Sequence, residues 1–270
     1  MAGKRRATRG ATRKQGGRGG LTKLLLVPVI ALAAAVVVAA FFLNGDATSR
    51  VKRALIADGL SEDYPNQTLI DALRTMLEKA GYRVDVAEGR QVNLELYEHL
   101  TDYDVIILRV HGGMAVEHTA SGNVYLGGIF TGVPWSDNYT QLGIERYVAK
   151  ARPILAPDKL YVAVLPRFWE EKLQGTFPNG SVMVVSSCWA TADPKVIAAL
   201  FDHGLSMYIG WNHKVTLHHA DTALYELVKA ALLEHMGWEQ AVVYVNRKLG
   251  PDPQTGAELY YALRSHYIRG

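Results

Sequence analysis

Short apolar runs rich in β-branched residues recur along this 270-residue chain, and stretches with helical periodicity separate several of them. The clearest runs are DVIILRV at 104–110, SVMVVS at 181–186 and MYIGW at 207–211. Uninterrupted apolar runs of this length are typical of strands buried on both faces. Strands joined through helices need crossover connections, which place helices on both faces of the sheet. The pattern predicts an α/β fold, a three-layer sandwich with a mostly parallel central sheet.

The other elements follow from residue periodicity. Residues 68–81 place five apolar side chains on one helical face and end at Gly81, a typical C-terminal cap. Further strands are predicted at 53–58, 82–87 and 160–165, and further helices at 94–100, 193–203, 220–235 and 239–249. The predicted globular domain covers residues 53–270.

Charge is distributed unevenly along the chain. Residues 1–23 contain eight lysines and arginines and no acidic residue, and their composition predicts a disordered tail. Residues 24–270 hold 21 basic and 26 acidic residues, a net charge of −5. A nucleic-acid-binding domain normally carries a basic patch or a high pI of its own, so this composition argues against nucleic acid as a partner.

The segment LLLVPVIALAAAVVVAAFFL at 24–43 is an uncharged apolar run of 20 residues. As a helix it would be about 30 Å long, which matches the apolar thickness of a bilayer. Because basic residues precede it, we expect a single-pass signal-anchor with a cytoplasmic N-terminus and, after a juncture at 44–52, an extracellular domain in the cell membrane. A cleaved signal peptide and a buried core helix are the alternatives, but the run is long for a signal peptide and no clear cleavage site follows it.

Two strand ends carry reactive side chains. His111 directly follows the run at 104–110, and Cys188, the only cysteine, closely follows the run at 181–186. In parallel α/β sheets, ligands bind beyond the carboxyl ends of the strands, where both side chains are expected. A thiol beside an imidazole is a nucleophile beside a general acid or base. The pattern alone also fits a cysteine that is simply a small buried hydrophobic residue.

This arrangement resembles the caspase–haemoglobinase clan of cysteine peptidases, in which one strand ends in His-Gly and a later neighbouring strand ends in the nucleophilic cysteine. More closely, the chain resembles a group of largely uncharacterised archaeal and bacterial caspase-like proteins. The likeness is carried by His111-Gly112, IFTGVPWSDNYT at 129–140, SVMVVSSCWA at 181–190, LFDHGLSMYIGWNHKVTLHHAD at 200–221 and LGPDPQTGAELYY at 249–261. It covers about residues 53–265 and implies a caspase-like domain.

The resemblance implies a thiol protease that hydrolyses peptide bonds with a His111 and Cys188 dyad. Cys188 would attack the scissile carbonyl and His111 would protonate the leaving amine, while the backbone N–H groups of Gly112 and Cys188 would bind the oxyanion. The expected partner is a protein or peptide substrate, with no cofactor and no metal. The resemblance also implies a substrate-binding wall made of Trp189, Trp211, Asn212 and His213.

The chain departs from the caspases themselves. His111 and Cys188 are 77 residues apart, against the roughly 50 expected of caspases. The cysteine lies in Ser-Ser-Cys-Trp-Ala rather than Gln-Ala-Cys-x-Gly, so caspase substrate choice is not implied. In the clan, acidic pocket residues select Arg or Lys and basic ones select Asp. The candidate selectors here are Asp193, Asp221 and Arg109.

Three alternatives stay open. A catalytically inactive caspase-like module would use the same cleft to bind a peptide or to scaffold a partner at the cell surface. A hydrolase acting on a non-peptide substrate would use the same dyad. A zinc site at His111, His118 and Cys188 is a further alternative. An open cleft shared by sulfur and imidazole would favour the peptidase, whereas a thiol buried under Trp189 would favour the inactive module.

Overall fold

The chain divides into two compact units, residues 1–50 and 51–270. A computed structural model describes residues 50–119, 122–154 and 156–267. The expected basic tail and membrane anchor at 1–43 lie outside the described residues. Within the described ranges, no helix is long and apolar enough to cross a membrane.

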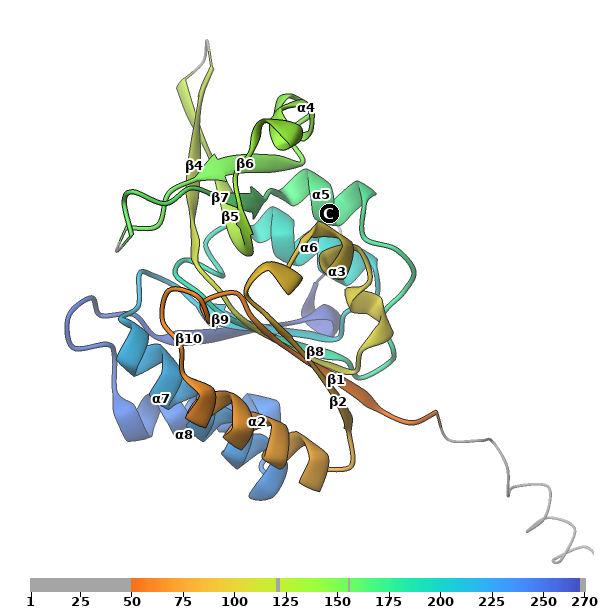
Figure 1. The fold of residues 1–270 in the computed structure, drawn as a ribbon. Coiled ribbons are helices and arrows are strands. Elements are labelled where there is room, and N and C mark those ends of the chain that lie inside the picture. Colours follow the sequence, from red (N-terminus) through yellow and green to blue (C-terminus); the bar gives the residue numbers. More distant parts are fainter. Residues whose placement is uncertain (1–49, 120–121, 155, 268–270) are drawn as a thin grey trace, which may run out of the picture. The chain divides into compact units, whose positions relative to one another are not determined.

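A six-stranded, mixed but mostly parallel sheet forms the centre of the second unit (Figure 1). Five strands pair in parallel, and one edge strand, β10, runs antiparallel to β9. The order across the sheet is β10 (Leu259–Leu263), β9 (Met207–Trp211), β8 (Val182–Ser186), β3 (Val105–Arg109), β1 (Arg53–Asp58) and β2 (Arg83–Glu88). The predicted α/β fold with a mostly parallel central sheet is confirmed.

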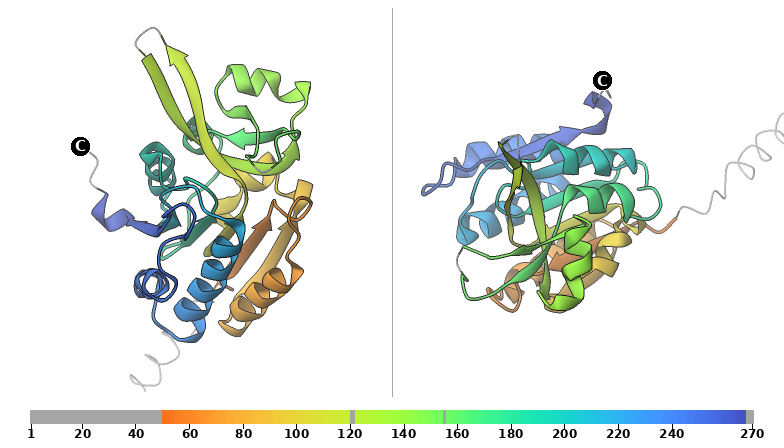
Figure 2. Two further views of the ribbon diagram at one scale, coloured as in Figure 1. Left: turned by 90° about the vertical axis from the view of Figure 1, so that its left-hand side faces the viewer. Right: turned by 90° about the horizontal axis from the view of Figure 1, so that it is seen from above.

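Helices cover both faces of this sheet (Figures 1 and 2). One face carries α2 (Gln67–Lys79), α7 (Leu217–Val228), which continues into a π-helical turn at Lys229–Leu233, and α8 (Trp238–Leu249). The other face carries α3 (Leu94–Glu98), α5 (Pro166–Glu171) and α6 (Pro194–Asp202). Ile107 of β3 packs into the core beneath α2, α7 and α8, whereas its neighbours Ile106 and Leu108 pack into the core on the opposite face. Central strands therefore read as continuous apolar runs because both of their faces are buried.

A second, antiparallel sheet lies beyond the carboxyl ends of the central strands (Figure 1). Its strands are β4 (Gly112–Thr119), β5 (Gly122–Pro134), β7 (Tyr161–Val164) and β6 (Val148–Ala151), and α4 (Thr140–Ile144) lies between β5 and β6 in the chain. β4 and β5 form a long hairpin that projects from the body of the unit (Figure 2). Because β4 begins directly after His111, this sheet borders the predicted dyad.

The strand predicted at 160–165 belongs to this second sheet, so its expected place in the central parallel sheet is wrong. β7 pairs antiparallel with both β5 and β6. The sequence of β4 and β5 is rich in glycine, which disfavours strands and hides their periodicity. Because β5, which pairs with β7, is not recognisable as a strand from the sequence, nothing in the sequence indicates an antiparallel partner for β7. Its short apolar run then looks like a strand of the central sheet.

Arg109, the last residue of β3, is a buried cation with 1% of its side chain exposed. Its guanidinium donates to Asp58 at 2.8 Å, to both carboxylate oxygens of Asp221 at 2.8 and 2.9 Å, and to the Tyr64 carbonyl oxygen at 3.0 Å. One side chain thus joins the ends of β1 and β3 to α7 and to the turn at 59–64.

Replacing Arg109 would leave two carboxylates in the interior without a counter-charge. We expect Arg109→Met to lower the free energy of unfolding by about 3–5 kcal/mol, measured by urea denaturation. The matched control is Arg83→Met, because the Arg83 side chain is 68% exposed and lies 4.0 Å from its partner Asp85. The control should lose less than about 1 kcal/mol. Equal losses in the two variants would contradict a structural role for the buried network.

Candidate active site

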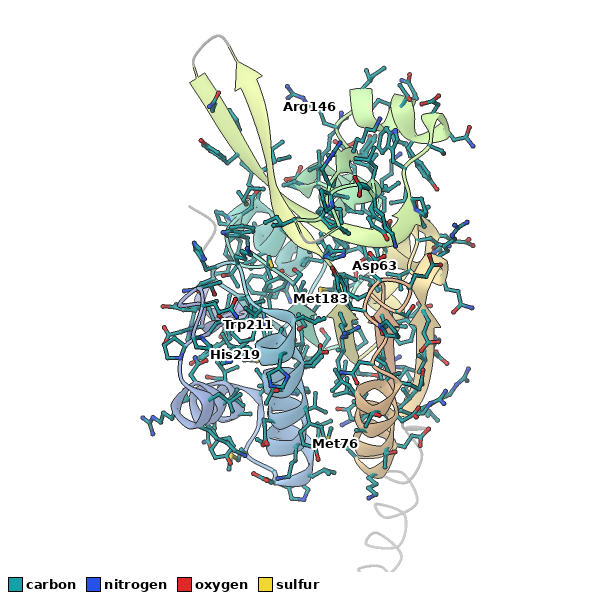
Figure 3. All side chains as sticks on the ribbon, turned by 60° about the vertical axis from the view of Figure 1, so that its left-hand side comes forward. Asp63, Met76, Arg146, Met183, Trp211 and His219 are labelled. Carbon is teal, nitrogen blue, oxygen red and sulfur yellow. The ribbon has the colours of Figure 1, made fainter. Side chains whose placement is uncertain are left out.

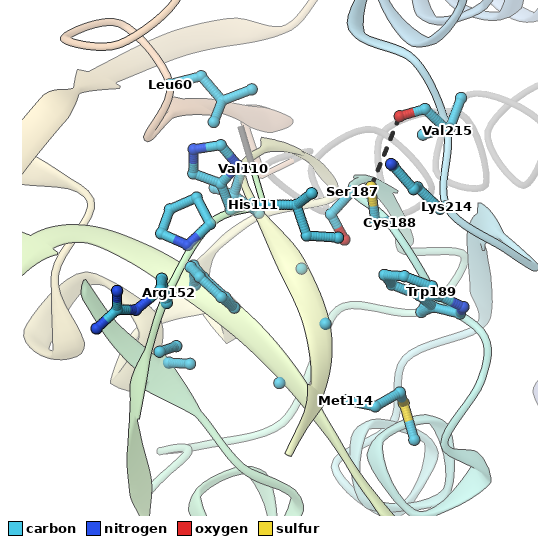
Figure 4. A pocket seen from close by; sticks show the side chains of 18 of the residues that line it. Leu60, Val110, His111, Met114, Arg152, Ser187, Cys188, Trp189, Lys214 and Val215 are labelled. Atoms are coloured by element: carbon cyan, nitrogen blue, oxygen red, sulfur yellow. Dashed lines mark hydrogen bonds between the residues drawn. The ribbon is translucent and has the colours of Figure 1, made fainter. Parts of the chain in front are cut away.

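Neighbouring parallel strands bring His111 and Cys188 to one edge of the central sheet. Arg109 of β3 is in register with Ser186 of β8, and the Val110 N–H donates to the Ser186 carbonyl oxygen at 3.3 Å. His111 lies two residues after Arg109, and Cys188 lies two residues after Ser186. Both line the same cavity, whose volume is about 430 Å³ (Figure 4). The thiol and the imidazole therefore face a shared space.

Cys188 is half-buried, and its thiol donates to the Val215 carbonyl oxygen at 3.6 Å (Figure 4). Burial raises the pKa of this thiol, and backbone hydrogen bonding and the charge of Lys214 only partly offset the effect. The next residue, Trp189, has a φ of 54°, in the left-handed region that side chains with a Cβ rarely adopt. The Trp189 N–H donates to the His213 carbonyl oxygen at 3.1 Å, which holds this sharp turn. Such local strain is concentrated at functional sites.

Gly112 packs closely against the backbone at the cysteine. A Cβ added to Gly112 would lie 2.4 Å from the Cys188 carbonyl oxygen and 2.6 Å from Ser187 Oγ, so a larger residue does not fit without movement. The two residues expected to supply the oxyanion N–H groups are therefore close neighbours in space.

His111 has an acidic partner, Asp63, that the sequence analysis did not single out. The His111 Nε2 lies 3.4 Å from Asp63 Oδ2. Since an ionised carboxylate only accepts hydrogen bonds, Nε2 carries the proton and Nδ1 is the basic nitrogen. Burial lowers the pKa of His111, and Asp63 opposes this shift. Three aromatic rings surround the imidazole, those of Tyr64, Phe130 and Tyr161.

Asp63 is held as a fixed anion. Its side chain is 3% exposed and accepts hydrogen bonds from the Tyr161 hydroxyl at 2.7 Å and from the Lys159 ammonium. Burial favours the protonated form, but these bonds and the one from His111 outweigh it and lower the pKa of Asp63. Asp63 lies in the turn after β1, whose backbone closes onto the Leu60 carbonyl oxygen. This carboxylate can therefore orient His111 and stabilise its imidazolium form.

Each of four adjacent strand ends is followed by a titratable side chain near the site. In the order β9, β8, β3 and β1, these are Lys214, Cys188, His111 and Asp63. Lys214 follows its strand by three residues and Asp63 by five. Ligands bind beyond the carboxyl ends of parallel strands, and this rule, which led to His111 and Cys188, also points to Lys214 and Asp63. They lie in turns, where periodicity does not show which way a side chain points.

The expected substrate-binding wall is divided in the structure. Trp189 lines the cavity, whereas the other three residues are not among its described lining residues. Trp211 is 2% exposed and packs beside the His219 ring at 5.5 Å (Figure 3). Asn212 pairs through its main chain and side chain with the segment before β10. His213 packs on Trp189, with ring centroids 5.6 Å apart.

The three candidate selectors are engaged within the fold. Arg109 and Asp221 bind each other. Asp193 accepts hydrogen bonds from the N–H groups of Gly127 at 2.7 Å and Lys195 at 3.0 Å, and so caps α6. None of the three is among the described residues that line the cavity.

A metal centre was one alternative for the same residues. Across the described ranges, no group of three or more His, Cys, Asp or Glu side chains is placed to hold a metal ion. The zinc alternative includes His118, whose side chain lies outside the described part of the molecule. That alternative stays a prediction.

Comparison with known proteins assigns no family: no protein-family model and no curated protein matches this chain. The likeness to caspase-like proteins therefore stays a prediction carried by the sequence segments quoted above.

The site itself is suited to thiol chemistry. Both candidate reactive groups are neutral near pH 7, because the pKa of Cys188 is raised and that of His111 is lowered. Their present hydrogen-bond partners are Val215 and Asp63, so the thiol must turn away from Val215 to reach the imidazole.

Because Cys188 is the only cysteine, alkylation by iodoacetamide reports on this thiol alone. The thiolate is the reactive form, and burial raises the pKa of Cys188. We expect the alkylation rate of the folded chain to rise with pH through a midpoint above that of the same chain in denaturing urea, as followed by mass spectrometry. A folded midpoint at or below the denatured one would show that the fold activates the thiol in the absence of substrate.

Proposed function

We propose that this chain is a membrane-anchored cysteine endopeptidase with a caspase-like fold, which hydrolyses peptide bonds with Cys188 and His111. The observation that carries the proposal is that a thiol and an imidazole from adjoining parallel strand ends line one cavity. The proposal includes an anchor at 24–43 and an extracellular domain. Its chemistry requires neither an organic cofactor nor a metal.

Catalysis begins when His111 Nδ1 removes the thiol proton as the Cys188 sulfur attacks the scissile carbonyl carbon. The N–H groups of Gly112 and Cys188 stabilise the oxyanion that forms. The imidazolium then gives its proton to the leaving amine as the C–N bond breaks, which leaves a thioester. A water molecule, deprotonated by His111, attacks the thioester, releases the carboxylic acid and restores the thiol.

The charge states of the site favour this general-base route over a preformed thiolate–imidazolium pair. Burial keeps Cys188 protonated and His111 neutral in the free protein. The imidazolium that forms during the reaction lies beside the ionised Asp63 carboxylate. Asp63 is therefore a positioning residue that also stabilises the developing positive charge.

A peptide-binding module without turnover is the second candidate. It is favoured by one observation, the hydrogen bond from the Cys188 thiol to the Val215 carbonyl oxygen, which directs the proton away from His111. Such a module would bind its partner in the same cavity.

The peptidase proposal is tested with a thiol-directed activity probe and a pool of fluorogenic peptides. Cys188→Ala should abolish probe labelling and turnover, and His111→Ala should lower kcat/KM by about 10²–10⁴-fold because the general base is lost. The matched control is His99→Ala, since His99 is exposed at the end of α3. Equal labelling of wild type and Cys188→Ala, with no peptide cleaved, would end the proposal and leave the binding module.

The role of Asp63 predicts a change in pH dependence. Asp63 raises the pKa of His111 against the effect of burial, so Asp63→Asn should lower that pKa further. His111 then stays neutral to lower pH, and the acidic limb of the kcat/KM profile should move to lower pH while its maximum falls. The control Glu62→Gln removes a neighbouring carboxylate, 3.7 Å from Arg90, and should leave the profile unchanged. An acidic limb that does not move in Asp63→Asn would refute this role.

A further inference from the structure

The peptide group between Val215 and Thr216 connects the Cys188 thiol to a buried carboxylate. Its carbonyl oxygen accepts the hydrogen bond from the thiol at 3.6 Å, and its N–H donates to Asp252 Oδ2 at 2.8 Å. A peptide group is planar and almost always trans, so its C=O and N–H point in opposite directions. One flat unit is therefore held by the carboxylate on one side and offers its oxygen to the thiol on the other.

Asp252 is fixed through both of its carboxylate oxygens. Oδ2 also accepts from the Thr216 hydroxyl at 2.5 Å, and Oδ1 accepts from the N–H groups of Gln254 and Thr255 at 2.9 and 3.0 Å. The Asp252 N–H donates to the Ala257 carbonyl oxygen at 2.9 Å. The residue is 2% exposed, and although burial favours the protonated form, these bonds lower the pKa of Asp252 to about 2. The carboxylate therefore stays ionised at neutral and mildly acidic pH.

This contact joins two segments that are distant in the sequence. Asp252 lies in the turn at 250–257 between α8 and β10, whereas Thr216 is the N-cap residue of α7. An N-cap threonine normally accepts a hydrogen bond from an N–H of its own helix. The Thr216 side chain makes no such bond, and its hydroxyl donates to Asp252 instead. The Thr216 side chain thus serves the contact with the turn rather than the helix.

The chain of hydrogen bonds acts on the direction and the charge of the thiol. Hydrogen bonds in a chain polarise one another, so a carboxylate bound to the N–H makes the Val215 carbonyl oxygen a stronger acceptor. Figure 4 shows Val215 and His111 on different sides of Cys188, so this acceptor directs the S–H away from the imidazole. Burial is the main cause of the raised pKa of Cys188, Asp252 adds to the rise and Lys214 opposes it. His111, which lines the same cavity, has a lowered pKa because it is buried.

We infer that Asp252 is a positioning residue, which fixes the 215–216 peptide group and so holds the Cys188 thiol protonated and turned away from His111 in the free protein. Breaking the link between the turn at 250–257 and the start of α7 releases the thiol toward the imidazole. The turn thereby controls how readily the only cysteine of the chain reacts. This inference goes beyond the proposed function, because it concerns the resting thiol and holds for a peptidase and for a binding module alike.

The S–H stretching band in the Raman spectrum of the full chain tests this inference without any substrate. The band comes from Cys188 alone, and hydrogen bonding of the thiol moves it to lower wavenumber. Asp252→Asn keeps the shape of the side chain but replaces one acceptor oxygen with a donor amide. Thr216→Val removes the hydroxyl bond and keeps the N–H bond. The matched control is Asp104→Asn, because Asp104 accepts the Arg53 N–H at 2.7 Å at the amino ends of the central strands, away from the cavity lining.

In Asp252→Asn the band should move to higher wavenumber. Alkylation by iodoacetamide at pH 7 should be at least about threefold faster, because loss of the negative charge lowers the pKa of Cys188 and increases the thiolate fraction. Thr216→Val should move the band in the same direction by a smaller amount, and Asp104→Asn should leave it in place.

Circular dichroism shows whether each variant is folded. A folded Asp252→Asn with the wild-type band would overturn the inference. If Asp252→Asn does not fold, an unshifted band in folded Thr216→Val would overturn it in the same way. None of these results requires peptide cleavage, so failure of the peptidase proposal would leave this inference standing, and failure of this inference would leave the peptidase proposal intact.

Discussion

The Arg109 guanidinium holds together the parts of the molecule on which the site depends. It binds Asp58 at the end of β1, Asp221 on α7 and the carbonyl oxygen of Tyr64. The residue before Tyr64 is Asp63, the partner of His111, so the buried cation and the dyad are linked through one short turn. Burial raises the pKa of Asp58 even with Arg109 beside it, which shows how unfavourable the desolvation is. A buried ion network adds little net stability compared with apolar residues, although removing one partner is costly, so we infer that its main role is to set geometry.

The resting site combines a protonated thiol with a neutral imidazole. Burial causes both states, since it disfavours charge on either group. A protonated thiol is also less open to oxidation than a thiolate, which suits the single cysteine of a domain proposed to face the cell exterior. In the proposed reaction, the charged form of His111 arises only during turnover, when Asp63 is already in place beside Nε2.

Sequence reasoning located the candidate pair His111 and Cys188 but only part of its surroundings. His111 and Cys188 were predictable because each lies two residues after a strongly apolar strand, and strand ends of a parallel sheet meet at one edge. Asp63 and Lys214 lie farther along their turns, and their orientation depends on backbone hydrogen bonds to Leu60 and on the path after β9. The second sheet was missed because the glycines of β4 and β5 erase the strand pattern. Trp211 was expected at the cavity, but its side chain fills the core beneath α7 instead.

By itself the sequence determined the α/β class, the alternation of strands and helices and two candidate reactive residues, because these depend on local periodicity and on strand ends. Only the tertiary structure decided which strands are neighbours, that Asp63 partners His111, and that residues of both sheets line one cavity with Cys188. These residues are far apart in the chain, and their contacts arise from the pairing order of two sheets. Local residue patterns carry no information about that order, because it depends on how whole faces pack against one another.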